Sequence, residues 1–205
     1  TLHSTSNAAT AAVTACPSAM LSIDPEDCFS SLPGNLEKYS AIAVGPGLGR
    51  DPRTVRALEV LLRAASEASI PMVLDADALN IISEHPDLMT MVPRGSVMTP
   101  HLGELRRLGG SGGELCRRSG CRVVRKGYHT EVLSPDGEVF SNTTGNPGMA
   151  KGGSGDVLTG LVGGLLARGY SGRDAALLGV WIHGYAGDCL TEECTTEAYS
   201  SADLV

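Results

Sequence analysis

The sequence has few aromatic residues, no excess of positive charge and no long apolar run. Phe, Trp and Tyr make up 4% of the 205 residues, and 23 acidic side chains against 16 basic ones give a net charge of −7. Proteins that bind nucleic acid present a basic surface or aromatic rings that stack on bases, so nucleic acid is not expected as a partner. No apolar stretch approaches the ~20 residues that cross a bilayer, and we therefore expect a soluble protein without a membrane partner.

The cysteines form no recognisable metal or redox motif. None of the six belongs to a CxxC pair, and their spacing matches no zinc site. Residues 1–20 lack the basic start and the apolar core of a signal peptide, so reduced thiols in the cytoplasm are expected. The sequence does not assign a role to these residues, which are Cys16, Cys28, Cys116, Cys121, Cys189 and Cys194.

Glycine, in contrast, is abundant, with 26 residues in the chain. Several of them are concentrated in the first half of one stretch, Gly145–Arg168. After Ser154, apolar residues recur at spacings of three and four, which predicts that a glycine-rich loop runs directly into a helix. The first N–H groups of a helix have no partner within it, and the helix dipole adds partial positive charge, so this junction suits a phosphate. Asp156, in the first turn, would be a proton acceptor beside the anion. The alternative is a capped helix with Ser154 as N-cap and Asp156 as an ordinary first-turn acid, but a cap does not require a run of glycines.

Short apolar runs alternate with helical patterns along much of the chain. Strands are expected at 41–44, 72–74, 97–98 and 122–125, and a hairpin is expected over 131–140. At this length the chain can bury one sizeable core. The alternation therefore predicts a single α/β domain whose mostly parallel sheet is covered by helices.

Residues 1–40 are weakly patterned and fit either an exposed arm or a truncated first unit of the fold. Towards the other end, a last helix is expected from Arg173 to Leu190. Its buried face is expected to hold Ala176, Leu177, Val180, Trp181 and Tyr185. Residues 201–205 are expected to form a short helical stub.

Glycine and acidic motifs follow two of the predicted strands at their carboxyl ends, the edge at which open α/β sheets bind ligands. The loop GPGLG at 45–49 is not a dinucleotide fingerprint, because Arg50 stands in the place of the third glycine; Gly47 is the residue we place against a ligand. Asp75 and Asp77 would hold Mg²⁺ through water, or Asp77 would instead cap a helix over 78–82.

Cations and hydrogen-bond donors follow the next strand ends. His101 begins a helix and is expected to point toward the same crevice, the alternative being a polar surface residue. Lys126–Thr130, KGYHT, places a cation and several donors where the phosphates or the adenosine of a nucleotide could lie, although an exposed lysine would look the same. Lys151 is a second candidate phosphate contact. These motifs are predicted to converge on one crevice.

Taken together, the motifs resemble the NAD(P)H-hydrate dehydratase family, carbohydrate-kinase-like proteins that repair hydrated nicotinamide cofactors. The resemblance covers residues 41–205, and its most specific part is NTTGNPGMAKGGSGDVLTG at 142–160. The other matching stretches are AVGPGLGRD at 43–51, VLDADALN at 73–80, TPHLGE at 99–104, KGYHT at 126–130 and GVWIHGYAGD at 179–188.

The resemblance implies a ribokinase-like three-layer α/β/α fold with a mostly parallel central sheet, and the activity of a nucleotide-dependent hydro-lyase. With Mg²⁺ present, ADP or ATP would phosphorylate the ring hydroxyl of hydrated NADH or NADPH (NADHX or NADPHX), phosphate would leave, and NAD(P)H would be restored. Carried over by motif, Gly47 and His101 contact the hydrated cofactor, and Asp156 lies at the hydroxyl as the base. The nucleotide would be bound by Lys126, Gly127, Tyr128, His129, Thr130 and Gly155. A homotetramer and a functional pairing with an NAD(P)HX epimerase are also implied.

Two segments depart from the family's pattern. The family's first strand and helix have no match in these 205 residues, so the substrate pocket is expected to be incomplete. Leu108–Gly120 is shorter and richer in glycine than in relatives, which leaves open whether a helix forms there. Two other functions also stay open: a vitamin-precursor kinase of the same fold, and a nucleotide-binding module without catalysis.

Overall fold

Six strands form the main sheet of the computed structural model, which describes all residues 1–205. The strands lie side by side in chain order: β3 (Ile42–Val44), β4 (Met72–Leu74), β5 (Val97–Met98), β6 (Arg122–Arg125), β7 (Glu131–Leu133) and β8 (Val139–Ser141). The first four are parallel, and β7 and β8 add an antiparallel hairpin. The predicted strands and the mostly parallel sheet are thus confirmed.

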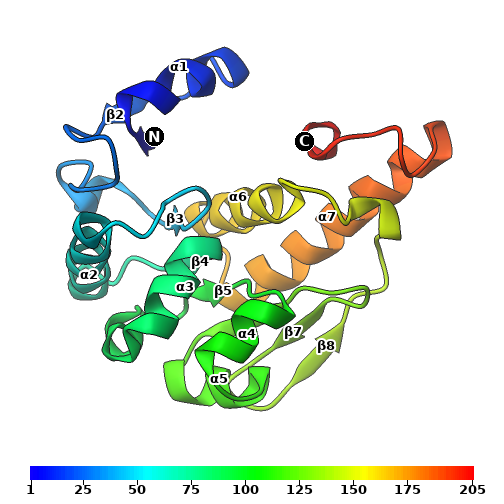
Figure 1. Cartoon of the computed structure of the whole chain (residues 1–205). Coiled ribbons are helices and arrows are strands. Elements are labelled where there is room, and N and C mark those ends of the chain that lie inside the picture. The colour runs from blue at the N-terminus through cyan, green and yellow to red at the C-terminus, as the bar shows by residue number, and fades with distance from the viewer.

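Helices cover both faces of this sheet (Figure 1). One face carries α2 (Pro52–Glu67), α3 (Ala76–Glu84), α4 (Leu102–Leu108), α5 (Gly112–Ser119) and the 3₁₀ turn η2 (Pro86–Met91); the other carries α6 (Ser154–Ala167) and α7 (Gly172–Glu193).

Successive residues of β4 point to opposite sides, because a strand alternates its side chains. Leu74 joins the larger core under α2–α5, and Val73 joins the smaller one under α6 and α7. The predicted three-layer α/β/α fold is confirmed.

The open question about Leu108–Gly120 is answered by α5, which is a well-capped helix. The Ser111 hydroxyl accepts a hydrogen bond from the Glu114 N–H, and the Glu114 carboxylate accepts one from the Ser111 N–H. Gly120 ends the helix in the left-handed conformation, with φ of 71°. The glycines that obscured the helix in the sequence therefore lie at its start and its end.

The first 40 residues are ordered structure rather than an exposed arm. β1 (Leu2–Ser4) and β2 (Leu21–Ile23) pair in parallel, joined by α1 (Ser6–Ala15), but neither is hydrogen-bonded to the six-stranded sheet. The connection to β3 contains the 3₁₀ turn η1 (Leu36–Lys38). This connection is anchored by Asp24, which is 3% exposed. Burial alone would raise the pKa of Asp24, but hydrogen bonds from Ser30 and its neighbours outweigh burial and hold that pKa below the ordinary value.

Helix α7 buries only part of the predicted face: Ala176 and Val180 are buried as predicted. Trp181 and Tyr185 are 45% and 51% exposed and stack on each other, with ring centroids 5.0 Å apart, so their expected place in the core is wrong. The buried stripe consists mainly of small residues, because a Cβ at Gly179 would lie 2.7 Å from Val162 of α6. Its members are Gly172, Ala175, Ala176, Gly179, Val180, Gly184 and Gly187.

The remaining 3₁₀ turns are η3 (Pro147–Met149), in the loop before α6, and η4 (Ser201–Leu204), which confirms the predicted C-terminal stub. No helix in the structure combines the length and apolar character needed to span a membrane.

The core under α2 gives a direct test of this packing. Leu62 is fully buried and Val60 on the same helix is 53% exposed. Leu62→Ala is expected to lower the free energy of unfolding by about 2–5 kcal/mol, because the lost contacts leave a cavity, whereas Val60→Ala is expected to change it by less than about 0.5 kcal/mol. Urea denaturation measures both variants, and equal midpoints would contradict the described burial of α2.

Candidate active site

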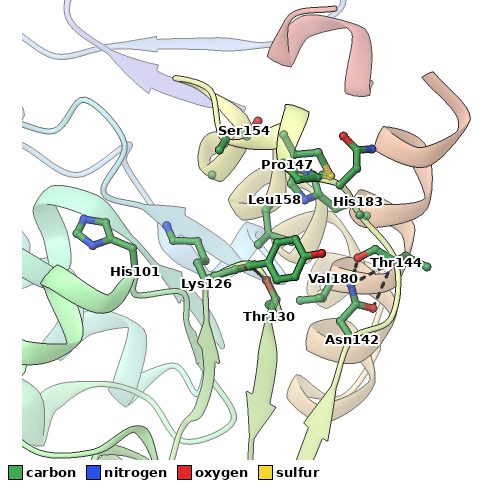
Figure 2. Close-up of a pocket in the computed structure, with 18 of the residues that line it drawn as sticks. His101, Lys126, Thr130, Asn142, Thr144, Pro147, Ser154, Leu158, Val180 and His183 are labelled. Carbon is green, nitrogen blue, oxygen red and sulfur yellow. Dashed lines mark hydrogen bonds between the residues drawn. The ribbon is translucent and has the colours of Figure 1, made fainter. Parts of the chain in front are cut away.

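A pocket of about 610 Å³ opens at the carboxyl edge of the sheet, where β6, the loop after β8, the start of α6 and the middle of α7 meet (Figure 2). His101 and Lys126 stand on one side of it, and Ser154, Pro147 and His183 stand on the other. The predicted residues that line it are His101, Lys126, Gly127, Tyr128, Thr130, Lys151 and Gly155. The motifs that follow β5 and β6 and the start of α6 thus converge on this pocket, whereas the GPGLG loop and Asp156 line a neighbouring groove, so the prediction of one common crevice is confirmed only in part.

The start of α6 presents unpaired backbone donors beside this pocket. Gly153 is the N-cap, with φ of 89°, so the alternative with Ser154 as N-cap is wrong. The N–H groups of Gly155 and Asp156 donate no hydrogen bond within the chain. A helix of 14 residues that begins with free amides has partial positive charge there, which makes this end a site for an anion.

Lys126 reaches the same point from β6. An isolated bridge pairs it in parallel with His101, and its N–H donates to Pro100 O at 2.9 Å, so the backbone fixes where the side chain starts. A Cβ on Gly155 would lie 3.2 Å from Lys126 Nζ, so a glycine gives the ammonium group room against the helix. The positive charge therefore lies directly beside the free amides.

A buried carboxylate holds that ammonium group in place. Asp75, at the end of β4 and 1% exposed, accepts a hydrogen bond from Lys126 Nζ at 2.6 Å and another from Thr159 Oγ1 at 2.8 Å. A charge buried to this degree needs both a counter-ion and hydrogen bonds. Asp75 has both, and the two partners come from β6 and α6.

Asp156 lies next to this ion pair. Burial raises its pKa above that of an ordinary aspartate and the negative charge of Asp75 adds to the effect, while Lys126 opposes it. Its side chain lines a neighbouring groove of about 350 Å³ between β1 and β3, whose other walls include Thr159 and Gly45. A raised pKa makes this carboxylate a better proton acceptor than one in free solution.

The GPGLG loop is docked on the segment that carries Asp75. A Cβ on Gly45, where φ is 133°, would lie 1.8 Å from the Asp75 carbonyl oxygen, so only glycine fits there. Gly49 N–H donates to Asp77 Oδ2 at 2.9 Å. Gly47 has open space around it but lines neither the pocket nor the groove, so its contact with a ligand stays a prediction.

The prediction that Asp77 caps a helix over 78–82 is wrong. α3 begins two residues earlier, at Ala76, and Asp75 stands at its N-cap position without a capping hydrogen bond from its side chain. Asp77 instead ties the first turn of α3 to Gly49.

His101 has two roles in the structure. Its Nδ1 accepts hydrogen bonds from the N–H groups of Gly103 and Glu104, at 2.9 and 3.3 Å, and so caps α4. Because Nδ1 accepts, the neutral ring carries its proton on Nε2. The ring is half exposed and lines the pocket, and its Nε2 lies 3.5 Å from Glu104 Oε1.

The remaining candidates are placed differently. Lys151 also lines the pocket, where its ammonium group donates to Thr196 O at 2.7 Å and to Tyr199 O; its contact with a phosphate stays a prediction. His129 does not line the pocket; it packs edge-on against Tyr128, whose side chain is 78% exposed at the pocket.

Sequence reasoning missed His183, which lines the pocket from α7. Burial lowers the pKa of this histidine, a hydrogen bond with the Ser154 backbone opposes the shift, and the nearby charge of Lys126 adds to it. The ring is therefore neutral at pH 7. Its spacing from Gly179 and Val180, four and three residues, was the signal that placed it on the buried face of α7.

A sequence profile described as NAD(P)H-hydrate dehydratase matches residues 1–205. The chain belongs to this family. It is 38% identical over 191 residues to the bifunctional NAD(P)H-hydrate repair enzyme Nnr of Moorella thermoacetica, covering 87% of this chain and 36% of that one. It is also 38% identical over 170 residues to the ADP-dependent (S)-NAD(P)H-hydrate dehydratase of Neisseria meningitidis, covering 76% and 57% of the two chains.

Solved structures of the family share the fold. The ADP/ATP-dependent NAD(P)H-hydrate dehydratase of Bacillus subtilis, co-crystallised with ATP and Mg²⁺ and soaked with CoA, matches with a TM-score of 0.80 at 28% identity. The match covers 98% of this chain and 75% of that one. The chain therefore spans about three quarters of that structure, and about a third of the bifunctional relatives.

The ion pair between Lys126 and Asp75 can be tested by stability. Lys126→Met leaves the Asp75 carboxylate buried without a counter-ion, so we expect the free energy of unfolding to fall by about 3–5 kcal/mol. The matched control is Arg125→Met, because Arg125 pairs with Glu131 where both side chains are partly exposed, and its loss should cost about 1 kcal/mol or less. The double change Lys126→Met with Asp75→Asn should recover part of the loss. Equal urea midpoints for the two single variants would show that the buried ion pair contributes no more to stability than the partly exposed one.

Proposed function

We propose that this chain carries out the nucleotide-dependent dehydration of hydrated NADH and NADPH, a hydro-lyase reaction of metabolite repair. In this reaction ADP or ATP phosphorylates the ring hydroxyl, and elimination of phosphate restores the reduced nicotinamide. The observation that carries the proposal is the start of α6. The unpaired Gly155 amide and Lys126 lie at the pocket, and the next residue, Asp156, brings an unpaired amide and a carboxylate of raised pKa at the neighbouring groove.

The phosphate end of the nucleotide would lie on the start of α6. Phosphoryl transfer depends on positioning and on neutralising charge, and the amides of Gly155 and Asp156 with the Lys126 ammonium supply both. The residues Lys126–Thr130 line the same pocket except for His129, so the rest of the nucleotide would extend along them.

No cluster of His, Cys, Asp or Glu in the structure forms a metal site, and both oxygens of Asp75 already have partners. Mg²⁺ would therefore be held mainly by the phosphates of the nucleotide, and it would supply further neutralisation of their charge.

Asp156 would take the proton of the ring hydroxyl as that oxygen attacks the terminal phosphorus and the nucleotide leaves with one phosphate fewer. Elimination then breaks the carbon–oxygen bond, phosphate departs, and the adjacent ring carbon loses a proton to form the double bond. Phosphate is a much better leaving group than hydroxide, which explains why a dehydratase would use a nucleotide. His101 and Gly47 are the proposed contacts of the hydrated nicotinamide.

The groove between β1 and β3 supports a proposal about the domain. It is lined by both strands and mostly by apolar residues, and no strand of these 205 residues pairs with the facing edges. We propose that the first strand of the ribokinase-like fold, which these residues do not supply, fills this groove and completes the substrate side of the site.

Two alternatives stay open. A hydroxyethylthiazole kinase from Pyrococcus horikoshii shares the fold with a TM-score of 0.71, but at 18% identity this likeness concerns the fold alone. A vitamin-precursor kinase would accumulate phosphorylated substrate, and a binding module would turn over nothing. The dehydratase would release free phosphate and regain the absorbance of reduced nicotinamide.

Asp156→Asn tests the proposed base. Hydrated NADH is incubated with Mg²⁺ and either ADP or ATP, and NADH recovery and phosphate release are followed. Wild-type turnover should rise with pH as Asp156 loses its proton, with a midpoint above that of an ordinary carboxylate. The D156N variant should lose at least ~100-fold in turnover while keeping its nucleotide affinity. Turnover that survives the substitution would contradict the assignment of Asp156.

The stability of Asp156→Asn as a function of pH gives a second measurement on this residue. Because the folded-state pKa of Asp156 is raised above its unfolded value, ionisation costs stability as the pH rises past the unfolded pKa. Removing the carboxylate should leave stability at pH 7 equal or higher, which separates a lost base from a damaged fold.

We further propose that the chain self-associates through the exposed face of α7, the family resemblance suggesting a tetramer. The stacked Trp181 and Tyr185 support this, together with an adjoining groove of about 450 Å³ lined by Phe140, Leu177 and Leu178. Pairing with an epimerase is also proposed, supported by the bifunctional names of relatives of which this chain covers about a third. The six free thiols support the cytoplasm as the compartment.

Trp181→Ala combined with Tyr185→Ala tests the interface. We expect the double variant to sediment as a smaller species than the wild type at equal concentration, because exposed aromatic patches drive association. Val60→Ala, exposed on the opposite layer, is the control and should leave the assembly unchanged. A monomeric wild type would refute the proposal.

A further inference from the structure

The C-terminal tail, residues 194–204, returns from the end of α7 and packs against the glycine-rich loop 145–153. Its 3₁₀ turn η4 contacts both α6 and α7. Because α6 begins directly after this loop, whatever holds the loop also fixes the start of the helix.

Lys151, in the middle of the loop, is the first point of attachment. Its ammonium group donates hydrogen bonds to the carbonyl oxygens of Thr196 and Tyr199, and it lies 3.9 Å from the centre of the Tyr199 ring. A cation over an aromatic face with two carbonyl acceptors is a specific, well-satisfied arrangement. The lysine is thus used to bind the tail.

Tyr199 is the second point of attachment. It is only 5% exposed, and its hydroxyl donates to Asn146 Oδ1 at 2.8 Å. The same oxygen accepts the Gly148 N–H at 3.0 Å, and the Asn146 amide donates to Gly187 O of α7 at 2.8 Å. Asn146 therefore joins the loop, the tail and α7 through one side chain.

Two loop glycines are needed for contact with the tail. A Cβ on Gly148 would lie 2.7 Å from the Tyr199 hydroxyl, and a Cβ on Gly153 would lie 2.5 Å from Ser201 Oγ. Gly153 is also the N-cap of α6, with its φ of 89°. The tail therefore contacts Gly153, whose backbone conformation sets the direction of the Gly155 and Asp156 N–H groups at the start of α6.

We propose that Tyr199 is a positioning residue for the phosphate site, and that residues 194–204 form a strap holding loop 145–153 in the conformation that keeps the Gly155 and Asp156 amides available to an anion. The proposal rests on the proposed function in taking that anion to be a nucleotide phosphate. Binding and strap closure are then linked, because each favours the same conformation of the loop and each strengthens the other by the same factor.

The test uses the full chain and the Tyr199→Phe variant, which keeps the ring over Lys151 and removes only the hydroxyl that bonds Asn146. One lost hydrogen bond corresponds to about a 3- to 10-fold change in an equilibrium. The affinity for ADP and for inorganic tripolyphosphate, measured by calorimetry, should therefore fall by this factor, and by the same factor for both, because the strap acts on the phosphate end. The matched control is Tyr170→Phe, an exposed tyrosine between α6 and α7, which should bind both ligands as the wild type does.

Hydrogen exchange in the absence of ligand gives a second readout that a general loss of stability would not reproduce. In the Tyr199→Phe variant the amides of residues 146–156 should exchange about 3- to 10-fold faster, while those of α2 keep their wild-type rates. Lys151→Met, which removes the ammonium group that donates to Thr196 O and Tyr199 O, should change the exchange rates in the same direction. The exchange rates of either variant therefore test the strap if the other variant fails to fold.

The outcomes separate the two proposals. Wild-type exchange rates in the loop of Tyr199→Phe, or unchanged affinity for tripolyphosphate, would overturn the strap. A wild-type chain that binds neither ADP nor tripolyphosphate would overturn the nucleotide function, and the exchange rates would still decide whether the tail holds the loop.

Discussion

The buried carboxylate of Asp75 is the constraint on which the arrangement of the site depends. It binds Lys126 and Thr159 through its two oxygens, and Gly45 packs directly on its backbone. Strand β6, helix α6 and the loop after β3 thus meet at one residue at the end of β4. Since the charge is 1% exposed, it is tolerated only while its partners stay in place. The residue that fixes the geometry also influences the chemistry: burial raises the pKa of the neighbouring Asp156, and the negative charge of Asp75 raises it further.

Much of the fold and part of the site followed from local patterns in the sequence. The strands were recognisable because buried parallel strands are short apolar runs, and the site because ligand-binding residues follow their carboxyl ends. The free amides at α6 were foreseen for the same reason, since a glycine-rich loop before an apolar helix is a local signal. His101 and Lys126 were placed correctly at the pocket because strand order puts them side by side.

The errors came from contacts between distant segments. Trp181 and Tyr185 were assigned to the core because apolar side chains suggest burial, whereas α7 packs through glycine and alanine so that its backbone can approach α6. The hydrogen bonds from Lys151 to the tail were not foreseen, because the acceptors at Thr196 and Tyr199 lie far along the chain. Asp77 was taken for a helix cap because its partner, Gly49, belongs to another loop. No local pattern contains such information.

The close packing of α6 on α7 has a consequence for how the molecule folds. These two helices pack closely on each other, and the loop before them and the tail after them are their neighbours along the chain. Contacts between segments close in sequence cost little loop-closure entropy, so they form readily. The C-terminal third can therefore assemble as a cooperative unit of its own, with the anion site already shaped within it, before the slower pairing of the parallel strands supplies Lys126 and Asp75 from outside.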